Sequence, residues 1–363
     1  MSKKILFLAN HFITLYSFRK ELISKLLEDG NEVYLSLPED NDNIYFSDLG
    51  CKIIETKIDR RGINPFEDLY LLYSYKKIIN DIKPDIIFSY TIKPNIYGTM
   101  ASNYKYKQVC NITGTGATFL NDNIISRIAK LLYKTSIRNC YKVFFQNTGD
   151  KDFFVENGLV KDNYDILPGS GCNVSEYNYV PMNNNERMTF IYIGRVMELK
   201  GIDEYLYAAK AIKEKYNNVD FLIAGWNEED KYIDIVNEYE KNGYVKYLGF
   251  SKEIKKILEE IDCVVLPSRG GEGVPNVVLE ACATGRPCIC SDVNGSNDVI
   301  TDGVNGLLFE KGNAQDLTDK IESFILMPFE ERQKMGENGR KTVEEKYDRQ
   351  IVIDQYLKEV ELA

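Results

Sequence analysis

Two acidic residues, Glu272 and Glu280, stand eight positions apart in the stretch RGGEGVPNVVLEACATGRP, residues 269–287. Glu272 lies among glycines, whereas Glu280 lies in an apolar segment typical of a helix. A charged side chain is costly to bury without a partner, so each carboxylate needs a group to bind. Because carboxylates accept hydrogen bonds from hydroxyl groups, we expect Glu280 to bind a ribose diol and Glu272 to bind sugar hydroxyls.

The helix that carries Glu280 is expected to run from about Val274 to Thr284. Pro275 suits its first turn, and Gly285 suits its C-terminal end. The apolar pattern CVVLPS precedes it, so the helix should begin at the carboxyl end of a strand. Free backbone N–H groups and the helix dipole at such a position favour a phosphate group.

A second stretch, YIGRVMELKGIDEYL (192–206), has the same layout. A strand is expected to end at Gly194, with Arg195 after it and Lys200 just before a helix. A planar guanidinium and a mobile ammonium together suit two phosphates, so the two stretches predict a nucleoside diphosphate with a sugar attached. The candidate catalytic residues are Arg195, Lys200 and Glu272. The candidate donor-binding residues are Gly194, Gly273, Val274, Pro275, Asn276 and Glu280.

Composition describes the setting of these residues. The chain has 363 residues, 44% of them hydrophobic and 28% charged, which is typical of a globular protein with two domains. Eight cysteines without a CxxC pattern indicate reduced thiols in the cytoplasm, and a single histidine argues against His-based metal sites. The net charge is −10, but residues 1–175 carry 22 basic and 20 acidic side chains, a balance of +2, against −12 for the remainder. We expect an anionic partner for the first half only, and no nucleic acid.

Strand-like and helix-like segments alternate through both halves and are separated by a Gly-, Asn- and Pro-rich stretch at 167–188. Such alternation predicts right-handed crossovers and parallel sheets. The expected fold is α/β, with two doubly wound Rossmann-like domains facing across a cleft. The first domain spans 1–180 and the second, donor-binding domain spans 181–344. The pattern at 343–362 predicts one long helix, and residues 345–363 are expected to return to the first domain.

These motifs resemble the retaining glycosyltransferases of family 4, which have the GT-B fold. The resemblance rests on the E-x7-E spacing of Glu272 and Glu280, on Gly194-Arg195 with Lys200-Gly201, and on the late DGVNGLLF. The N-terminal stretches FRKEL, DRRGINP, YTIKPNIYG and NITGTG resemble a bacterial branch that builds capsule, O-antigen or other lipid-linked oligosaccharides. The resemblance implies that Arg195 and Lys200 hold the donor diphosphate, Glu280 the ribose and Glu272 the donor sugar.

The acceptor side is expected in the first domain. His11 follows the first strand, although a structural role is the more favoured interpretation for a lone histidine. Relatives often carry a histidine where this chain has Tyr90-Thr91-Ile92-Lys93, so Thr91 and Lys93 become candidates in its place. Arg60 and Arg61 could bind the acceptor or lie in a solvated turn. Gly114 and Gly116 could allow close approach of a substrate or serve only to form a turn. The candidate acceptor-binding residues are His11, Arg19, Arg60, Arg61, Thr91, Lys93, Gly114 and Gly116.

The segment 124–142 contains five basic residues and no acid. Spacings of three and four residues predict that they share one helix face, which is either a solvated surface or a face that meets anionic lipid. The candidate membrane-binding residues are Lys130, Lys134 and Arg138.

The sequence therefore predicts a metal-independent glycosyltransferase without a cofactor, peripheral at the cytoplasmic face of the membrane. It would move a hexosyl or N-acetylhexosaminyl group from a nucleotide sugar, preferably a UDP-sugar, to a polyprenyl-diphosphate-linked saccharide, with retention implied by the resemblance alone. The acidic triplet at 40–42 is interpreted as a loop rather than a metal site. Alternatives are an epimerase or phosphorylase on the same fold, or a non-catalytic sugar-nucleotide-binding protein. A dinucleotide dehydrogenase is disfavoured, because the first strand ends without a G-x-G-x-x-G fingerprint.

Overall fold

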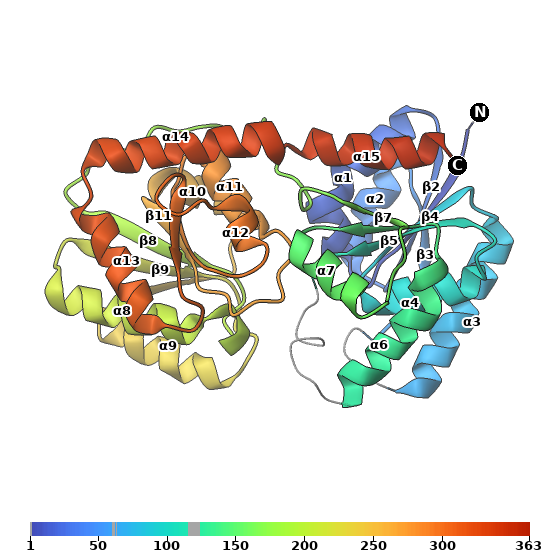
Figure 1. Ribbon diagram of the computed structural model, residues 1–363, viewed down its shortest axis with the longest axis horizontal. Coiled ribbons are helices and arrows are strands. Elements are labelled where there is room, and N and C mark those ends of the chain that lie inside the picture. Colours follow the sequence, from blue (N-terminus) through green and yellow to red (C-terminus); the bar gives the residue numbers. More distant parts are fainter. Residues whose placement is uncertain (1, 60–61, 63, 115–123) are drawn as a thin grey trace. The chain divides into compact units, whose positions relative to one another are not determined.

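The computed structural model describes residues 2–59, 62, 64–114 and 124–363, and the chain divides into two compact units. Unit 1 comprises Met1–Ser170 and Gln350–Ala363, and unit 2 comprises Gly171–Arg349. Each unit is an α/β structure with one parallel sheet and helices on both of its faces (Figure 1). The predicted fold class, two doubly wound parallel-sheet domains, is confirmed.

The sheet of unit 1 has seven strands in the order β3-β2-β1-β4-β5-β6-β7. The strand order reverses between the adjacent strands β1 and β4, which are parallel like the other pairs. The strands are β1 (Lys4–Leu8), β2 (Glu32–Leu37), β3 (Lys52–Glu55), β4 (Ile86–Tyr90), β5 (Lys107–Ile112), β6 (Lys142–Phe145) and β7 (Tyr164–Ile166).

Helices cover both faces of this sheet because successive strand residues point to opposite sides. Ile5 and Phe7 of β1 share a core cluster with side chains of α1 and α15. Leu6 and Leu8 pack on the other side with side chains of α3. The helices of unit 1 are α1 (Phe12–Glu28), α2 (Ile44–Leu49), α3 (Pro65–Ile82), α4 (Ile92–Ser102), α6 (Ile124–Ser136), α7 (Thr148–Glu156) and α15 (Arg349–Glu361), with short 3-10 helices η1 (Asn41–Asn43) and η2 (Ile137–Asn139).

The sheet of unit 2 has six strands in the order β10-β9-β8-β11-β12-β13, so its order reverses between β8 and β11. In doubly wound sheets, ligands bind at the carboxyl ends of the strands where the order reverses. The strands are β8 (Met188–Ile193), β9 (Val219–Ala224), β10 (Lys246–Gly249), β11 (Cys263–Leu266), β12 (Cys288–Ser291) and β13 (Gly306–Phe309). The helices are η3 (Glu198–Lys200), α8 (Ile202–Lys215), α9 (Lys231–Lys241), α10 (Ile254–Glu260), α11 (Asn276–Thr284), α12 (Ser296–Val299), α13 (Ala314–Leu326) and α14 (Phe329–Lys346).

The structure divides the chain at 170/171, whereas the sequence predicted a division at 180/181. The residues in between have little periodicity, but they pack with unit 2. Cys172 and Val174 join one of its core clusters. The guanidinium of Arg340 donates hydrogen bonds to the carbonyl oxygens of Val174 and Tyr177. Tertiary contacts that leave no local pattern therefore set this boundary.

The expectation of a single helix over 343–362 is wrong, because the structure has two helices, α14 and α15, with a break at Tyr347 and Asp348. At the break the backbone pairs with Cys172: the Cys172 N–H donates to the Tyr347 carbonyl, and the Arg349 N–H donates to the Cys172 carbonyl. The Tyr347 hydroxyl donates to the carbonyl of Asp298 at 2.6 Å. Residues from 350 onward belong to unit 1, where Tyr356 lies in the core, so the predicted return of the last helix is confirmed.

Candidate active site

The loops after β8 and β11 carry the charged residues that the sequence singled out in unit 2. These strands are neighbours, with Val264 of β11 paired to Ile191 of β8. Arg195 and Lys200 follow β8, and Glu272 follows β11. We call these three residues the β8–β11 loop site. It lies where the strand order reverses, which is the expected position of a ligand in this type of sheet.

Lys200 and Glu272 form an ion pair at the centre of the β8–β11 loop site. Their side chains are only 17% and 16% exposed, and the Ser268 hydroxyl donates a hydrogen bond to Glu272 Oε1 at 3.0 Å. Burial raises the pKa of Glu272, but the Lys200 ammonium and these hydrogen bonds outweigh burial and hold the pKa below its usual value. Glu272 is therefore a carboxylate and Lys200 is its counter-ion, a pairing that the sequence did not predict.

Arg195 lies at the edge of the same site and is more exposed than Lys200. Its Nη1 atom is 3.8 Å from Oε1 of Glu228, a residue of the loop after β9 that sequence reasoning missed. Glu228 also accepts a hydrogen bond from the indole N–H of Trp226 at 2.9 Å. A loose ion pair on one side leaves part of the guanidinium surface open to solvent, so Arg195 retains capacity to bind an anion.

Helix α11 begins at Asn276, two residues later than predicted, and Pro275 occupies the position just before the helix rather than its first turn. Pro275, the residue at the N-cap, makes no side-chain hydrogen bond to this N-terminus. Gly270 and Gly271, in the loop before it, have φ values of +113° and +75°, which favour glycine. Gly285 ends the helix in the left-handed conformation, as expected. The first N–H groups of α11 therefore lie beside the loop that carries Glu272.

Glu280 lies in the second turn of α11 and is partly buried. Burial raises its pKa to about 7, although the positive charge of Arg349 and a hydrogen bond from Tyr177 oppose that rise. These neighbours come from distant parts of the chain and were not predicted as partners. A carboxyl group that titrates near neutral pH can both accept and donate hydrogen bonds, which suits a contact with a diol.

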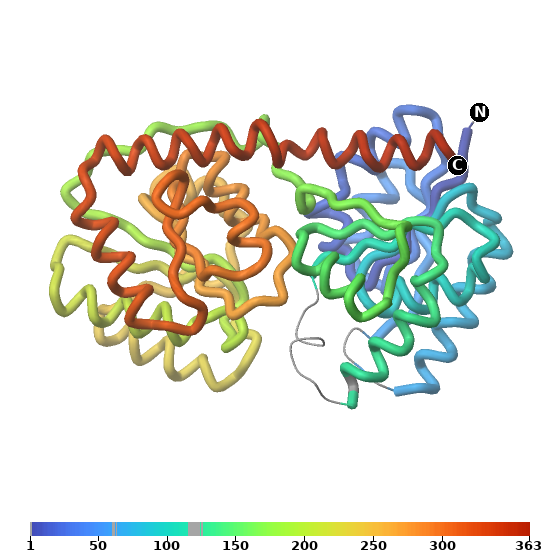
Figure 2. Tube along the Cα trace, viewed as in Figure 1, coloured from blue at the N-terminus to red at the C-terminus, as the bar shows by residue number. Residues whose placement is uncertain are grey.

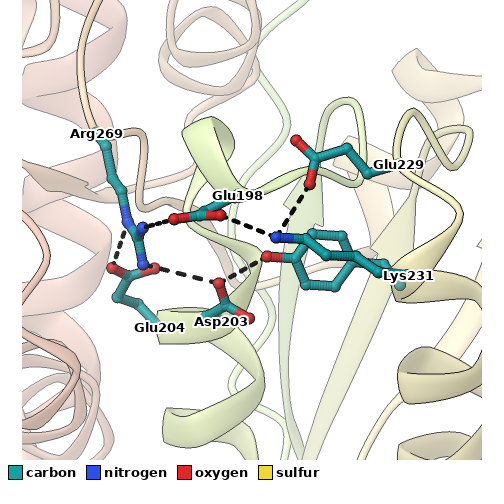
Figure 3. Close-up of polar contacts among 7 residues, drawn as sticks. Glu198, Asp203, Glu204, Glu229, Lys231 and Arg269 are labelled. Carbon is teal, nitrogen blue, oxygen red and sulfur yellow. Dashed lines mark hydrogen bonds and ion pairs between the residues drawn. The ribbon is translucent and has the colours of Figure 1, made fainter. Parts of the chain in front are cut away.

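A set of polar contacts around Arg269 joins the two loops a few residues from Lys200 and Glu272 (Figure 3). Arg269 donates hydrogen bonds to Glu204 at 2.8 Å and to Glu198 at 2.9 Å. Lys231 lies 2.8 Å from the second oxygen of Glu198. We call this set the Arg269 network; its members are Glu198, Asp203, Glu204, Lys231 and Arg269.

The Arg269 network fixes the segment 198–204 to the segment 268–272. The backbone N–H of Arg269 donates to the carbonyl of Leu199 at 2.9 Å, which adds a backbone link to the side-chain contacts. A side chain at Gly201 would overlap the carbonyl of Pro267, so the two segments approach closely. The network therefore sets where Lys200 and Glu272 can lie.

His11, Arg19 and Lys93, candidate acceptor residues of unit 1, each contact residues outside that candidate set. His11 caps α1, and its Nδ1 atom accepts a hydrogen bond from the N–H of Ile13 at 3.1 Å. Lys93 forms an ion pair with Asp68 at 2.8 Å. Thr91 follows β4 with a φ of +71°, a strained value for threonine, and its buried hydroxyl has no hydrogen-bond partner among the described residues. Gly114 has a φ of +123°, which suits a turn.

Arg19 lies in the core of unit 1 rather than at a surface. Its guanidinium stacks over the rings of Tyr90 and Tyr356, 5.2 and 5.1 Å from their centroids. Its Nε atom donates to both hydroxyl groups. A side chain that is 2% exposed has a packing role here, which corrects its expected contact with an acceptor. Arg60, Arg61 and Gly116 lie outside the described residues.

The basic segment forms a shorter face than predicted. Helix α6 ends at Ser136, so Arg138 lies in η2 and Lys142 lies in β6, where it pairs with Asp165 at 2.7 Å. Lys134 is exposed, but the Lys130 ammonium lies over the ring of Phe153. The five basic side chains therefore do not share one helical face, because the helix that would align them stops after three of them.

In the described part of the chain, no group of three or more His, Cys, Asp or Glu residues is arranged to hold a metal ion. None of the helices in that part is both long and apolar enough to cross a membrane.

Comparisons with known proteins agree with this geometry. Residues 4–147 match the family model described as "Glycosyl transferase 4-like", and residues 179–342 match "Glycosyl transferases group 1". The N,N'-diacetylbacillosaminyl-diphospho-undecaprenol alpha-1,3-N-acetylgalactosaminyltransferase of Campylobacter jejuni is 27% identical, over 98% of this chain and 97% of its own. The Escherichia coli UDP-Gal:alpha-D-GlcNAc-diphosphoundecaprenol alpha-1,3-galactosyltransferase is 26% identical, over 73% of this chain and 70% of its own.

Among solved structures, a Rickettsia africae glycosyltransferase has a TM-score of 0.80 at 16% identity, over 98% of this chain and 97% of its own. Anabaena HepE, solved with UDP and glucose, has a TM-score of 0.79 at 18% identity, over 99% of both chains. Two parallel-sheet domains of this kind define the GT-B class of glycosyltransferases. The chain is a glycosyltransferase with a GT4-like domain in unit 1 and a group 1 domain in unit 2.

Proposed function

We propose that this enzyme is a retaining glycosyltransferase that moves a hexosyl or N-acetylhexosaminyl group from a UDP-sugar to a lipid-diphosphate-linked saccharide. The names of the Campylobacter and Escherichia relatives support this acceptor class, and the UDP in Anabaena HepE supports the nucleotide. Such a reaction belongs to the synthesis of bacterial surface glycans.

The observation that carries the proposal is the ion pair of Lys200 and Glu272 beside the start of α11. A donor diphosphate would replace Glu272 as the partner of Lys200 and would accept hydrogen bonds from the N–H groups of α11. Glu272 would then accept hydrogen bonds from hydroxyl groups of the donor sugar, and Glu280 from the ribose. Without the donor, the ion pair keeps both side chains in place and their charges balanced.

The reaction would proceed on one face of the sugar. The bond between the anomeric carbon and the phosphate oxygen breaks while the acceptor oxygen bonds to the same carbon from the same side. The acceptor hydroxyl gives its proton to the departing phosphate, and UDP is released. Arg195, Lys200 and the α11 N–H groups would stabilise the negative charge that grows on this phosphate, so the proposal needs no metal ion.

Meeting a lipid-linked acceptor requires contact with a membrane surface. We place this contact at unit 1, which has 23 basic and 23 acidic side chains, whereas unit 2 has 22 and 32 and a net charge of −10. Each basic residue near an anionic bilayer contributes about 1 kcal/mol, so the charge difference favours this unit at the cytoplasmic face.

The test is a transfer assay with purified protein, a panel of UDP- and GDP-sugars, and a short-chain lipid-diphosphate saccharide, with the new linkage examined by NMR. We expect acceptor-dependent release of UDP and a product with the donor's anomeric configuration. An inverted product would refute the mechanism. Isomerised donor without acceptor would indicate an epimerase, a requirement for inorganic phosphate would indicate a phosphorylase, and binding without transfer would indicate a sugar-nucleotide-binding protein.

A further inference from the structure

Helix α3 exposes large apolar side chains over its first two turns. Phe66, Leu69, Tyr70 and Tyr73 are between 59 and 81% exposed. Their spacing of three, one and three residues places them on one side of the helix. The other side holds Leu71, Tyr75 and Ile79, which pack into the core of unit 1. Helix α3 is therefore apolar on both sides, and only one side is buried in the core.

Helix α6 has the same feature. Ile124, Ile128 and Leu131 are between 53 and 76% exposed, and spacings of four and three residues align them along the helix. Its opposite side buries Ala129 and Tyr133. We call the exposed apolar residues of the two helices the α3–α6 face; its members are Phe66, Leu69, Tyr70, Tyr73, Ile124, Ile128 and Leu131.

The two halves of the α3–α6 face belong to one surface region of unit 1. Both helices contact α4. Figures 1 and 2 show that α3 and α6 both begin at the lower edge of this unit. The exposed apolar residues lie in the N-terminal parts of both helices, the parts that begin at this edge. Exposed apolar side chains grouped in this way mark an interaction site.

The charges beside the α3–α6 face indicate which partner it meets. On α3, the exposed charged residues that follow Tyr73 are Lys76, Lys77 and, in the last turn, Asp81, and the acidic Glu67 and Asp68 are only partly exposed. Asp68 is also paired with Lys93. On α6, the exposed charged residues are basic and the segment contains no acid. Apolar and aromatic side chains bordered by basic ones match the interface of an anionic bilayer.

We infer that the α3–α6 face enters the interfacial layer of an anionic lipid bilayer. This inference rests on the proposed function, because a lipid-linked acceptor must be met at a membrane. It adds apolar insertion to the charge attraction proposed above, so binding should persist in high salt. Phe66, Tyr70 and Lys93 also line a cavity of about 370 Å³ in unit 1, together with the acidic Asp59, Glu67 and Asp68, so a cavity lined in part by charged groups lies next to the proposed membrane surface.

The test is flotation with vesicles of phosphatidylglycerol and phosphatidylethanolamine. The variant carries Leu69→Gln, Tyr73→Gln, Ile128→Gln and Leu131→Gln, and it leaves the cavity residues unchanged. The matched control carries Phe250→Gln and Leu326→Gln, which replace exposed apolar residues of unit 2. We expect the variant to partition on the order of 100-fold more weakly, because apolar area no longer leaves water, and the control to match the wild type.

Salt separates insertion from charge attraction. Wild-type protein should still float at ~1 M NaCl, where screening acts within about 3 Å. A variant that floats as wild type does, or wild-type binding that disappears at this salt concentration, would overturn the inference. So would a variant that binds vesicles normally but turns a wild-type dimer into a monomer in light scattering, since the face would then join two copies of the chain.

Transfer to a short-chain, water-soluble acceptor keeps the two proposals distinguishable. The variant should retain wild-type rates in this assay, because the replaced residues lie on the exposed side of the helices. Absence of transfer by the wild type would refute the proposed function. The flotation result would still decide, independently, whether the α3–α6 face binds a bilayer.

Discussion

Two candidate residues of unit 2, Lys200 and Glu272, contact each other, whereas His11, Arg19 and Lys93 of unit 1 contact residues outside the candidate set. Lys200 and Glu272 come from stretches about seventy positions apart and form an ion pair. In unit 1, His11 caps a helix, Arg19 lies in the core, and Lys93 pairs with Asp68. Both units have a parallel sheet whose strand order reverses once, so the fold alone does not explain the difference.

The difference lies in the sequence patterns that point to these residues. In unit 2, two charged stretches each follow a strand and precede a helix, and the sheet joins those two strands. In unit 1, the candidates depend on position in a motif and on resemblance, which do not distinguish a surface side chain from a buried one. A site built from loops of adjacent strands is therefore easier to predict than one distributed over a domain.

The largest expected effect is that of removing the central cation. Lys200→Ala should lower kcat about 10²–10³-fold, because the charge growing on the leaving phosphate loses a stabilising partner. The control is Lys213→Ala in α8 of the same unit, which has an acidic partner at 3.4 Å and should keep wild-type turnover. Steady-state kinetics with a UDP-sugar measures both. A Lys200→Ala kcat within twofold of the wild-type value would show that the ion pair does not contribute to catalysis.

The next effect concerns the Arg269 network. Arg269→Ala leaves the buried carboxylate of Glu204 without its closest cation, and losing hydrogen bonds to charged groups costs about 1.5–3 kcal/mol. We expect both a lower free energy of unfolding and weaker UDP binding, because the network no longer fixes the positions of Lys200 and Glu272.

Calorimetry and chemical denaturation measure these two quantities. Arg187→Ala, which breaks an exposed pair with Asp220 in the same unit, should change stability by at most about 1 kcal/mol. Loss of stability with unchanged UDP binding would assign the Arg269 network a purely structural role.

Arg19→Met tests whether this unit 1 candidate has a packing role rather than a role in acceptor binding. The Tyr90 and Tyr356 hydroxyl groups lose a buried partner, so the protein should lose about 1–3 kcal/mol of stability. The KM for acceptor should not change, because the side chain does not reach the surface. Lys20→Met, the neighbouring cation on α1, is the matched control. A raised KM for the acceptor without loss of stability would show that Arg19 contributes to acceptor binding after all.

The smallest effect is a pH dependence. Glu280, with a pKa raised to about 7, loses its proton as pH rises through neutrality, and the carboxylate is the stronger acceptor for a ribose diol. UDP affinity should therefore fall about tenfold between pH 8 and pH 6. Because the folded pKa is raised, ionisation of Glu280 also lowers stability as pH rises from about 4.5 to 7. Glu280→Gln should flatten the affinity profile in titration calorimetry, and an unchanged slope would assign the titration to another group.

Much of the fold could be predicted from the alternation of apolar strands and helices, and the position of Lys200 and Glu272 from the strands before them. The break at Tyr347 could not, because it depends on backbone pairing with Cys172. The Arg269 network left a partial signal, since three acids flank Lys200 between 198 and 204. Helix α3 shows the limit of periodicity: both sides are apolar, so the pattern cannot tell which side packs.

Hydrogen exchange with and without UDP, in excess EDTA, tests the central claim most directly. The account predicts slower exchange in peptides covering 194–201 and 268–285, with little change over unit 1, because the diphosphate contacts the two loops and the start of α11 without a metal ion. Protection confined to unit 1, or protection that appears only after magnesium or manganese is added, would contradict it.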